Sequence, residues 1–335
     1  MNSKKVLIIR LSAMGDVVFT IPLANALKDN GYEVSWLVGD KGVNLLKNNP
    51  AVDEVIHIKK GLKEYLKTIK YIRSQKFDIA IDTQGLLKTF IWTRFCGAKR
   101  RIISKSAREG AVLGGNEVIE KLYTSWDTHV TEDYLKFAKY IGIDVNEPKV
   151  TLPASSEETI KKLDELLKSI DYSKPIITIA PATTWVNKHW NKDNWKALVQ
   201  KLKENYTLIF TGTNNDNDLI EYISQGAGLN LCGKTNLDEL CELFRRSDLV
   251  ISLDSGSTHL AWGTQVPKIV SIFCCTPKTR YAPIGSDDKY ISLAGNLSCQ
   301  PCHKKKCPLG TNECTNYPSV DEVLNAVHKL LSAKN

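Results

Sequence analysis

A lone acid follows the first apolar run of the chain. The run Val6–Ile9 leads into "RLSAMGDVVFTIP", in which Gly15 precedes Asp16. A dinucleotide-binding turn at this place would read G-x-G-x-x-G, so that the backbone could approach a pyrophosphate. Here one glycine and one carboxylate occupy the turn. Asp16 would act either as a general base or, as is commoner at this spacing, as a cap at the positive end of a helix.

A second stretch, "LVISLDSGSTHLAWG", ends an apolar run in an acid and small hydroxyl residues. Asp254 closes the run, and Ser255–Thr258 open a helix whose free N–H groups and positive end favour an anion. A plain capped helix explains the same residues. His259 would lie one turn into this helix, where it either reaches a phosphate or is a core histidine.

A third stretch, "APATTWVNKHWNKDNW", offers hydroxyls and a mobile cation. Thr183, Thr184 and Lys188 suit a leaving diphosphate, whereas a polar loop with Asn191 capping the next helix is the alternative. The position just past a predicted strand is shared by Asp16, Asp82–Gly85, Thr183-Thr184, Gly212 and Asp254–Gly256. Ligands bind at that edge of open α/β sheets, so we expect these residues to converge on one crevice.

Positive charge gathers in the first half of the chain. One run comprises Lys59, Lys60, Lys63, Lys67, Lys70 and Arg73, and a second comprises Lys99, Arg100, Arg101, Lys105 and Arg108. Charge runs usually form a solvated face, which is the expected role of Lys67, Lys70 and Arg73. The others would attract an acidic acceptor or lipid headgroups, at about 1 kcal/mol per cation near an anionic surface.

Four cysteines fall close together near the C-terminus. Their spacing is Cys299-x2-Cys302-x4-Cys307-x6-Cys314, which fits tetrahedral thiolate ligation of a structural zinc or iron. The spacing and the neighbouring Lys304–Lys306 also resemble a nucleic-acid-binding zinc knuckle, but no aromatic residue for base stacking lies between these cysteines. Reduced thiols with a local metal site are favoured over a disulfide framework.

The composition is that of a globular protein with two domains. The 335 residues exceed the usual size of a single core, and the 42% hydrophobic and 24% charged contents argue against disorder. A net charge of +8 favours anionic partners. No apolar run approaches the length of a transmembrane helix, and the N-terminal run is too short for a signal peptide, so we expect a cytoplasmic protein.

Strand-like and helix-like segments alternate, as in parallel α/β sheets joined by helical crossovers. Strands are expected at 6–11, 33–38, 54–58, 77–81, 176–180, 208–211, 249–253 and 269–273. Pro22 either lies in the first turn of a helix over 20–29 or kinks it. We predict two doubly wound, Rossmann-like domains facing a cleft. Their ranges are 1–150 and 176–318, with a linker region at 151–175 and a C-terminal helix at 319–335.

Five stretches in sequence order carry a resemblance: "RLSAMGDVVFTIP", "FDIAIDTQGLLKT", "TTWVNKHW", "LCGKTNLDEL" and "SLDSGSTHLA". Over nearly the whole chain they resemble the lipopolysaccharide heptosyltransferases, ADP-heptose-dependent glycosyltransferases of the GT-B fold. "IDTQGLLK" and "KSAREG" are most similar to enzymes that add the first heptose to the Kdo sugar. The resemblance implies an inverting transfer onto Kdo-lipid A or inner-core lipopolysaccharide. It places the protein at the inner face of the inner membrane, with no nucleic-acid partner.

The resemblance also implies roles for single residues. Asp16 becomes the catalytic base, and Lys188 offsets charge on the leaving ADP. The residues implied to bind the donor are Thr183, Thr184, Lys188, Asp216 (at the ribose), Asp254, Ser255, Gly256, Ser257 and His259. The residues implied to bind the acceptor are Lys59, Lys60, Lys63, Gln84 and Arg108. No cofactor is required for catalysis, because protein cations and a helix end stand in for a metal.

Two departures from the family pattern keep other functions open. Trp185 stands where the family has a charged residue, and the cysteine-rich tail is more similar to that of second-heptose enzymes. A second-heptose enzyme or a protein-modifying heptosyltransferase, some of which use cysteine-bound iron, is one alternative. A non-catalytic sugar-nucleotide or nucleic-acid-binding protein with a four-cysteine metal knuckle is another.

Overall fold

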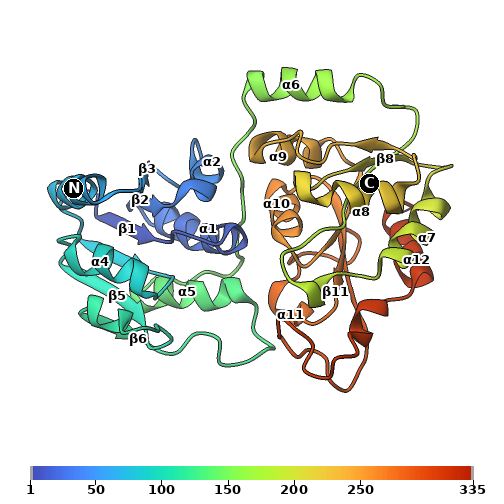
Figure 1. The fold of residues 1–335 in the computed structure, drawn as a ribbon. Coiled ribbons are helices and arrows are strands. Elements are labelled where there is room, and N and C mark those ends of the chain that lie inside the picture. The colour runs from blue at the N-terminus through green and yellow to red at the C-terminus, as the bar shows by residue number, and fades with distance from the viewer. Residues whose placement is uncertain (1–2, 333–335) are drawn as a thin grey trace. The chain divides into compact units, whose positions relative to one another are not determined.

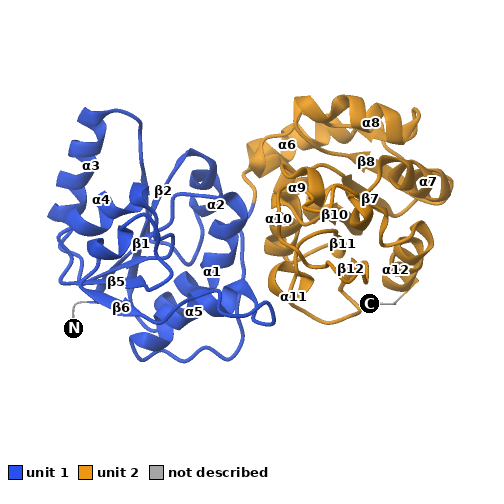
Figure 2. Cartoon of the chain, turned by 60° about the horizontal axis from the view of Figure 1, so that its bottom comes forward, with its two compact units in different colours: residues 1–154 blue, residues 155–335 orange. Residues whose placement is uncertain are grey.

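The computed structural model describes residues 3–332 and contains two compact units. Unit 1 ends at Ala154 and unit 2 begins at Ser155 (Figure 2). Each unit has one six-stranded sheet in which every strand pair is parallel. The structure confirms the predicted α/β class with two doubly wound parallel sheets.

The sheet of unit 1 has the strand order β3-β2-β1-β4-β5-β6 (Figure 1). Its strands are β1 (Lys5–Ile9), β2 (Glu33–Val38), β3 (Glu54–His57), β4 (Ile79–Asp82), β5 (Arg100–Ser104) and β6 (Glu117–Ile119). Its helices are α1 (Met14–Asp29), α2 (Val43–Leu46), α3 (Leu62–Ser74), α4 (Leu87–Phe95) and α5 (Val130–Tyr140), with short 3-10 helices η1 (Asp40–Gly42) and η2 (Ala111–Gly114). Helix α1 packs against α5, and α3 packs against α4.

The sheet of unit 2 has the order β12-β11-β10-β7-β8-β9. Its strands are β7 (Ile176–Ala180), β8 (Thr207–Phe210), β9 (Leu229–Asn230), β10 (Leu249–Leu253), β11 (Lys268–Phe273) and β12 (Tyr290–Ala294). Its helices are α6 (Glu157–Leu167), α7 (Lys192–Leu202), α8 (Asn217–Ser224), α9 (Leu237–Arg245), α10 (Gly256–Thr264), α11 (Lys278–Tyr281) and α12 (Val320–Ser332), with 3-10 helices η3 (Val186–Lys188), η4 (Asn214–Asp216) and η5 (Glu313–Asn316).

Each sheet is buried by apolar side chains of its helices. In unit 1, Ile72 of α3 and Trp92 of α4 pack with Leu7 and Ile9 of β1. In unit 2, Trp195 of α7 and several residues of α12 pack against the central strands. Among residues 3–332, no helix is both long and apolar enough to cross a bilayer.

Several elements differ from the sequence-based expectations. Helix α1 begins at Met14, six residues before the predicted start, so Pro22 lies inside it. Strands β5 and β6 were not expected, because their charged residues obscure the apolar pattern; Arg100 and Glu117 satisfy each other across the two strands. The segment 151–175, predicted as a linker region, contributes α6 to unit 2, where Leu163 and Leu167 pack with Leu243 of α9.

Candidate active site

The predicted site residues follow the two strand pairs at which each sheet reverses its order. In unit 1 the reversal lies between β1 and β4, and in unit 2 it lies between β7 and β10. Such points leave a crevice at the carboxyl ends of the strands, where ligands of open α/β sheets bind. Asp16 and Gln84 follow β1 and β4, whereas Lys188 and Asp254 follow β7 and β10. Each unit therefore holds its own candidate site.

Asp16 lies in the first turn of α1, and three groups hold its carboxylate. Oδ1 accepts a hydrogen bond from the Tyr134 hydroxyl at 3.2 Å and lies 2.8 Å from Nη2 of Arg10. Oδ2 accepts from the backbone N–H of Ala13 at 3.2 Å. The side chain remains 37% exposed. Asp16 therefore caps the helix and also presents a fixed, accessible carboxylate at the sheet edge.

Arg10 is the buried anchor of this arrangement. Its Nη1 donates to the Thr83 carbonyl at 2.6 Å and its Nη2 to the Tyr134 hydroxyl at 2.7 Å. Burial by itself lowers the pKa of Arg10, but Asp16, two tyrosines and Asp82 raise it overall. Burial raises the pKa of Tyr134 well above 10, so its hydroxyl stays protonated and can donate to Asp16.

Sequence reasoning assigned no role to Arg10 or Tyr134. Arg10 directly follows the first apolar run and stands at the same edge as Asp16, so its position was a usable signal. Tyr134 comes from α5, 118 residues beyond Asp16, and no local spacing links the two.

Gln84 fastens the loop that leads to Asp16. Its side-chain carbonyl accepts from the Leu11 N–H at 2.9 Å, and its amide donates to the Ser12 hydroxyl at 3.2 Å. The Arg108 loop lies beside it, since the Arg108 N–H donates to the Gly85 carbonyl at 2.9 Å. Gln84 and Arg108, both predicted to bind the acceptor, therefore share the edge that carries Asp16.

The other basic residues of unit 1 are dispersed. Lys59 and Lys60 follow β3, two strands away from β1, and Lys63 lies in the first turn of α3. No hydrogen bond or ion pair joins these three lysines to Asp16 in the described chain. In the second basic run, Arg100 makes a two-point ion pair with Glu117 at 2.7 and 2.8 Å. Arg100 is therefore engaged within the sheet rather than available to an acceptor.

A buried carboxylate with two basic partners lies at the strand reversal of unit 2. The side chain of Asp254, directly after β10, is only 2% exposed. Lys188 Nζ lies 2.7 Å from its Oδ2, and His259 Nε2 lies 3.5 Å from its Oδ1. Lys188 also lies 4.8 Å from the ring centroid of Trp185, within the range of a cation–π contact. One direction of the Lys188 ammonium is taken by Asp254, and its other N–H donors can face a ligand.

The pairing of Asp254 makes folding stability depend on pH. Burial alone raises the pKa of Asp254, but His259 and Lys188 together lower it well below its ordinary value of 3.8. A carboxyl group whose pKa is lower in the folded state stabilises the fold at pH values above its ordinary pKa. That stability is lost as the pH falls toward the pKa of the folded state. We expect wild-type unfolding free energy to fall by about 2 kcal/mol below pH 4 from this group, and Asp254→Asn to lose that slope. Urea unfolding measured across acidic pH tests this; equal slopes would contradict it.

The start of α10 offers donors to an anion. Ser255 is its N-cap but makes no side-chain cap bond, and the Ser255 hydroxyl is buried without a hydrogen-bond partner among the described residues. The first N–H groups of a helix lack intrahelical acceptors, so Gly256 and Ser257 present donors at the positive helix end. The Thr258 hydroxyl closes the turn by donating to the Leu253 carbonyl. This arrangement can bind a phosphate.

The remaining predicted donor residues lie on the neighbouring loops of the same edge. Thr183 and the exposed Thr184 follow β7, and the His189 ring bonds the Thr183 carbonyl at 2.8 Å. Asp216 follows β8, and its Oδ2 accepts from the N–H and the hydroxyl of Thr213, each at 2.7 Å. Because β10, β7 and β8 are consecutive in the sheet, the three loops line one edge.

The cysteine-rich segment folds against these loops. The Asn187 amide donates to the Lys304 carbonyl at 3.0 Å, and the His303 N–H donates to the Cys275 carbonyl at 2.8 Å. The ring centroids of Trp185 and His303 are 5.5 Å apart. Trp185, the departure from the family pattern, therefore packs between Lys188 and this segment.

The four cysteines of the same segment are the predicted metal ligands. Across residues 3–332, no group of three or more His, Cys, Asp or Glu side chains could hold a metal ion. Cys299 is exposed whereas Cys314 is buried. Burial and the neighbouring thiols of Cys302, Cys299 and Cys307 raise the pKa of Cys314 to about 11. Binding of zinc or iron by these four cysteines stays a prediction, and the proposed chemistry does not use a metal.

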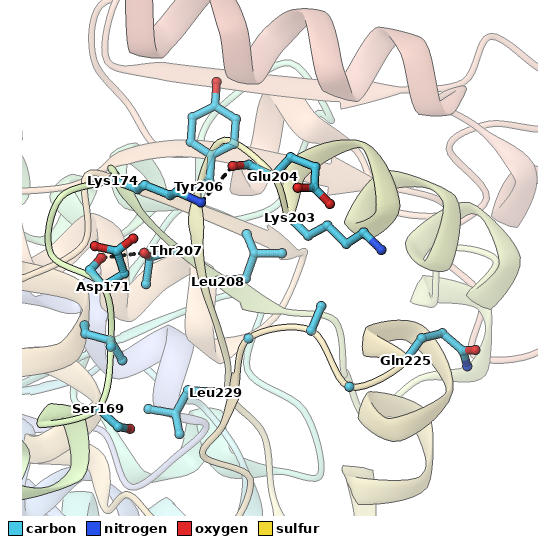
Figure 3. Close-up of a pocket in the computed structure, with 14 residues that line it drawn as sticks. Ser169, Asp171, Lys174, Lys203, Glu204, Tyr206, Thr207, Leu208, Gln225 and Leu229 are labelled. Carbon is cyan, nitrogen blue, oxygen red and sulfur yellow. Dashed lines mark hydrogen bonds between the residues drawn. The ribbon is translucent and has the colours of Figure 1, made fainter.

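A hollow of about 520 Å³ lies elsewhere in unit 2 (Figure 3). It is lined by residues just before β7 and at the beginning of β8 and β9, among them Lys174, Thr207 and Leu229. Lys174 is held there by a hydrogen bond to the Glu204 carbonyl at 2.8 Å. These residues mark the amino ends of the strands, and none of the predicted site residues lines the hollow.

The chain is similar to known proteins over most of its length. The sequence pattern of glycosyltransferase family 9 (heptosyltransferase) matches residues 65–312. The lipopolysaccharide core heptosyltransferase OpsX of Haemophilus influenzae is 29% identical over 87% of this chain and 84% of its own. The solved structure of ADP-heptose LPS heptosyltransferase II of Escherichia coli aligns with a TM-score of 0.78 and 20% identity over 98% of both chains.

A further solved structure, E. coli heptosyltransferase WaaC with ADP, aligns with a TM-score of 0.71 and 20% identity. The alignment covers 97% of this chain and 99% of that one. These likenesses establish the GT-B fold of the two sheets. Since the family pattern covers most of the sequence, the chain belongs to glycosyltransferase family 9, the heptosyltransferases, and is an enzyme of that class.

Proposed function

We propose that this chain transfers a heptose from ADP-heptose to the Kdo region of the lipopolysaccharide inner core, with inversion at the anomeric carbon. The observation that carries the proposal is the Asp16 carboxylate, fixed but accessible at the strand reversal of unit 1. Family membership and a relative named as a core heptosyltransferase support the substrate class. The neighbour with bound ADP supports an ADP-sugar donor.

On the acceptor side, Asp16 acts as the general base. As the acceptor oxygen bonds to the anomeric carbon, its proton passes to a carboxylate oxygen of Asp16, an effect typically worth ~10²–10⁴ in rate. Arg10, Tyr134 and Ala13 hold that carboxylate in one orientation, so little reorganisation is needed at the moment of transfer. Gln84 is a positioning residue, because it fixes the loop between β1 and α1.

On the donor side, the bond from the anomeric carbon to the diphosphate oxygen breaks, and its electron pair leaves with ADP. Lys188, the N–H groups at the start of α10 and the Ser255 hydroxyl offset the charge that develops on the diphosphate. Thr183 and Thr184 supply further hydroxyls, and Asp216 lies on the loop proposed to meet the ribose. The buried Asp254 carboxylate holds Lys188 and His259 in place through its contacts with both side chains.

The acceptor is anionic and lipid-linked, which fits the basic character of unit 1. Arg108 lies at the edge that carries Asp16, and Lys59, Lys60 and Lys63 are proposed to reach more distant acidic groups of the acceptor. A lipid-linked acceptor also places the protein in the cytoplasm, at the inner surface of the inner membrane.

The proposal is tested with purified protein, ADP-heptose and two acceptors. We expect heptosylated Kdo-lipid A and an equal amount of released ADP, measured by mass spectrometry and a coupled ADP assay. Transfer only to the already heptosylated acceptor would overturn the first-heptose assignment in favour of a second-heptose enzyme. Absence of ADP release with either acceptor would contradict the transfer reaction and favour a sugar-nucleotide sensor.

A further inference from the structure

Helices α3 and α4 and the short η2 expose an unusual set of apolar side chains. Leu62 is 76% and Leu113 is 74% exposed. The set that we name the α3–α4 face comprises Leu62, Leu66, Leu87, Ile91, Phe95 and Leu113. Residues 62 and 66 are one helical turn apart, as are 87, 91 and 95, so each row lies on one side of its helix. The exposure therefore belongs to continuous stripes rather than to scattered side chains.

These stripes are not needed for the core. On α3 the opposite side carries Tyr65, Ile69 and Ile72, which pack with the core of unit 1. Tyr65 meets Trp92 of α4 edge to face, with 5.4 Å between ring centroids. Helix α3 is thus joined to α4 through its inner side, which leaves Leu62 and Leu66 facing solvent.

The turn η2 extends the same face. A Cβ on Gly114 would lie 3.2 Å from Cβ of Thr93 and 3.3 Å from the Phe90 carbonyl oxygen, so η2 sits directly against α4. Leu113 precedes that contact and is exposed beside α4. Three separate segments therefore contribute to one apolar face.

The face is surrounded by positive charge. Residues 59–113 contain 14 Lys and Arg against 4 Asp and Glu, out of 45 and 37 in the whole chain. The rest of the chain thus has slightly more acidic than basic residues, and this segment carries the entire positive excess. Lys63, Lys67 and Lys70 interleave with the leucines of α3 and are exposed, and the described chain records no ion pair for them. Arg94 lies over the ring of Phe95 at 5.7 Å on α4.

We propose that the α3–α4 face docks on the surface of an anionic lipid bilayer. Leucine, isoleucine and phenylalanine side chains enter the boundary between headgroups and acyl chains, while the lysines bind lipid phosphates. Five of the six side chains of the face are aliphatic and give no stacking surface to nucleic acid. A symmetric pairing of two copies through this face would oppose one lysine row to another, which disfavours it.

The inference rests on the proposed location at a membrane, and it names the face that makes the contact. It is tested by sedimentation of the full chain with phosphatidylcholine vesicles that contain phosphatidylglycerol, without either sugar substrate. Failure of docking is therefore distinguishable from failure of the transfer reaction. Wild-type protein should bind these vesicles, and high salt or removal of phosphatidylglycerol should release it.

Two double variants probe the two components of the face. Lys67→Glu with Lys70→Glu should lower the partition coefficient by about thirtyfold or more, because each lysine contributes about 1 kcal/mol near an anionic surface. Leu66→Gln with Ile91→Gln should lower it by about tenfold or more, since inserted apolar area is lost. Melting curves close to wild type would show that both variants fold.

Matched controls carry the same changes on unit 2. Lys161→Glu with Lys203→Glu repeats the charge reversal at exposed lysines, and Tyr172→Gln with Val266→Gln repeats the loss of exposed apolar side chains. Both controls should bind vesicles within about twofold of wild type. Equal losses in controls and face variants would overturn the proposal. So would wild-type binding by the face variants, or a dimer in ultracentrifugation that these variants dissociate without any effect on vesicles.

Discussion

Replacing Asp16 with asparagine should lower the turnover number by at least about a hundredfold and leave the affinity for ADP unchanged. The amide cannot take the proton of the acceptor hydroxyl, but it has nearly the same size and can still accept the Ala13 hydrogen bond. Unit 2 carries every residue proposed to hold ADP, so donor binding is independent of this change. Steady-state kinetics and calorimetric titration with ADP measure the two quantities.

The Asp16→Asn variant loses an ion pair as well as the proposed base, and these two effects must be separated. Asp53→Asn is the control, because it loses an ion pair at a residue with no proposed role in the reaction. Like Asp16, Asp53 is partly exposed, at 33%, and contacts one cation, Lys28, and one backbone N–H, that of Val34. It precedes β3 and so lies at the amino edge of the same sheet. Asp53→Asn should therefore keep turnover close to wild type. A turnover of Asp16→Asn within about tenfold of that control would remove Asp16 from the proposed chemistry.

The fold could be predicted where apolar runs are uninterrupted. β7 and β10 are buried along their length and β1 from Val6 onward, and their sequences are apolar enough to stand out. β5 begins with Arg100 and Arg101, which suggest a solvated segment, and only the structure shows that Glu117 on β6 neutralises Arg100. Helix α1 was predicted over 20–29, with Pro22 either in its first turn or at a kink. Its start at Met14 follows instead from the Asp16 carboxylate, which accepts the Ala13 N–H.

The positions of the candidate residues could also be predicted, but their partners could not. The rule that ligands bind at the carboxyl ends of parallel strands indicates the loops of Asp16, Lys188 and Asp254. It does not show that Lys188 and Asp254 contact each other, because they lie 66 residues apart on loops of different strands. The sequence therefore suggested a free cation for the diphosphate, whereas the structure shows a cation shared with a buried acid.

That sharing leads to a second large expected effect. Lys188→Met removes the cation 2.7 Å from the buried Asp254 carboxylate and should destabilise unit 2 by about 3 kcal/mol. His259 remains beside the other oxygen, which keeps the cost near the lower end of the usual range. Affinity for ADP should also fall by about tenfold or more, because a charge-assisted contact to the diphosphate is lost. Thermal or urea unfolding and ADP titration measure these effects.

A second substitution separates the two roles of Lys188. In Lys188→Met with Asp254→Asn, the buried charge is gone together with its partner, so much of the lost stability should return, whereas the loss of ADP affinity should persist. Lys162→Met is the matched control, since Lys162 pairs with the buried Glu239 on α9 and neither residue is among those proposed to bind ADP. That change should leave ADP affinity as in wild type. If the double variant recovered ADP affinity along with stability, Lys188 would serve only to neutralise Asp254. The diphosphate would then depend on the Ser255 hydroxyl and the amides of α10 alone, so the charge on the leaving group would be offset by a helix end rather than by a side-chain cation.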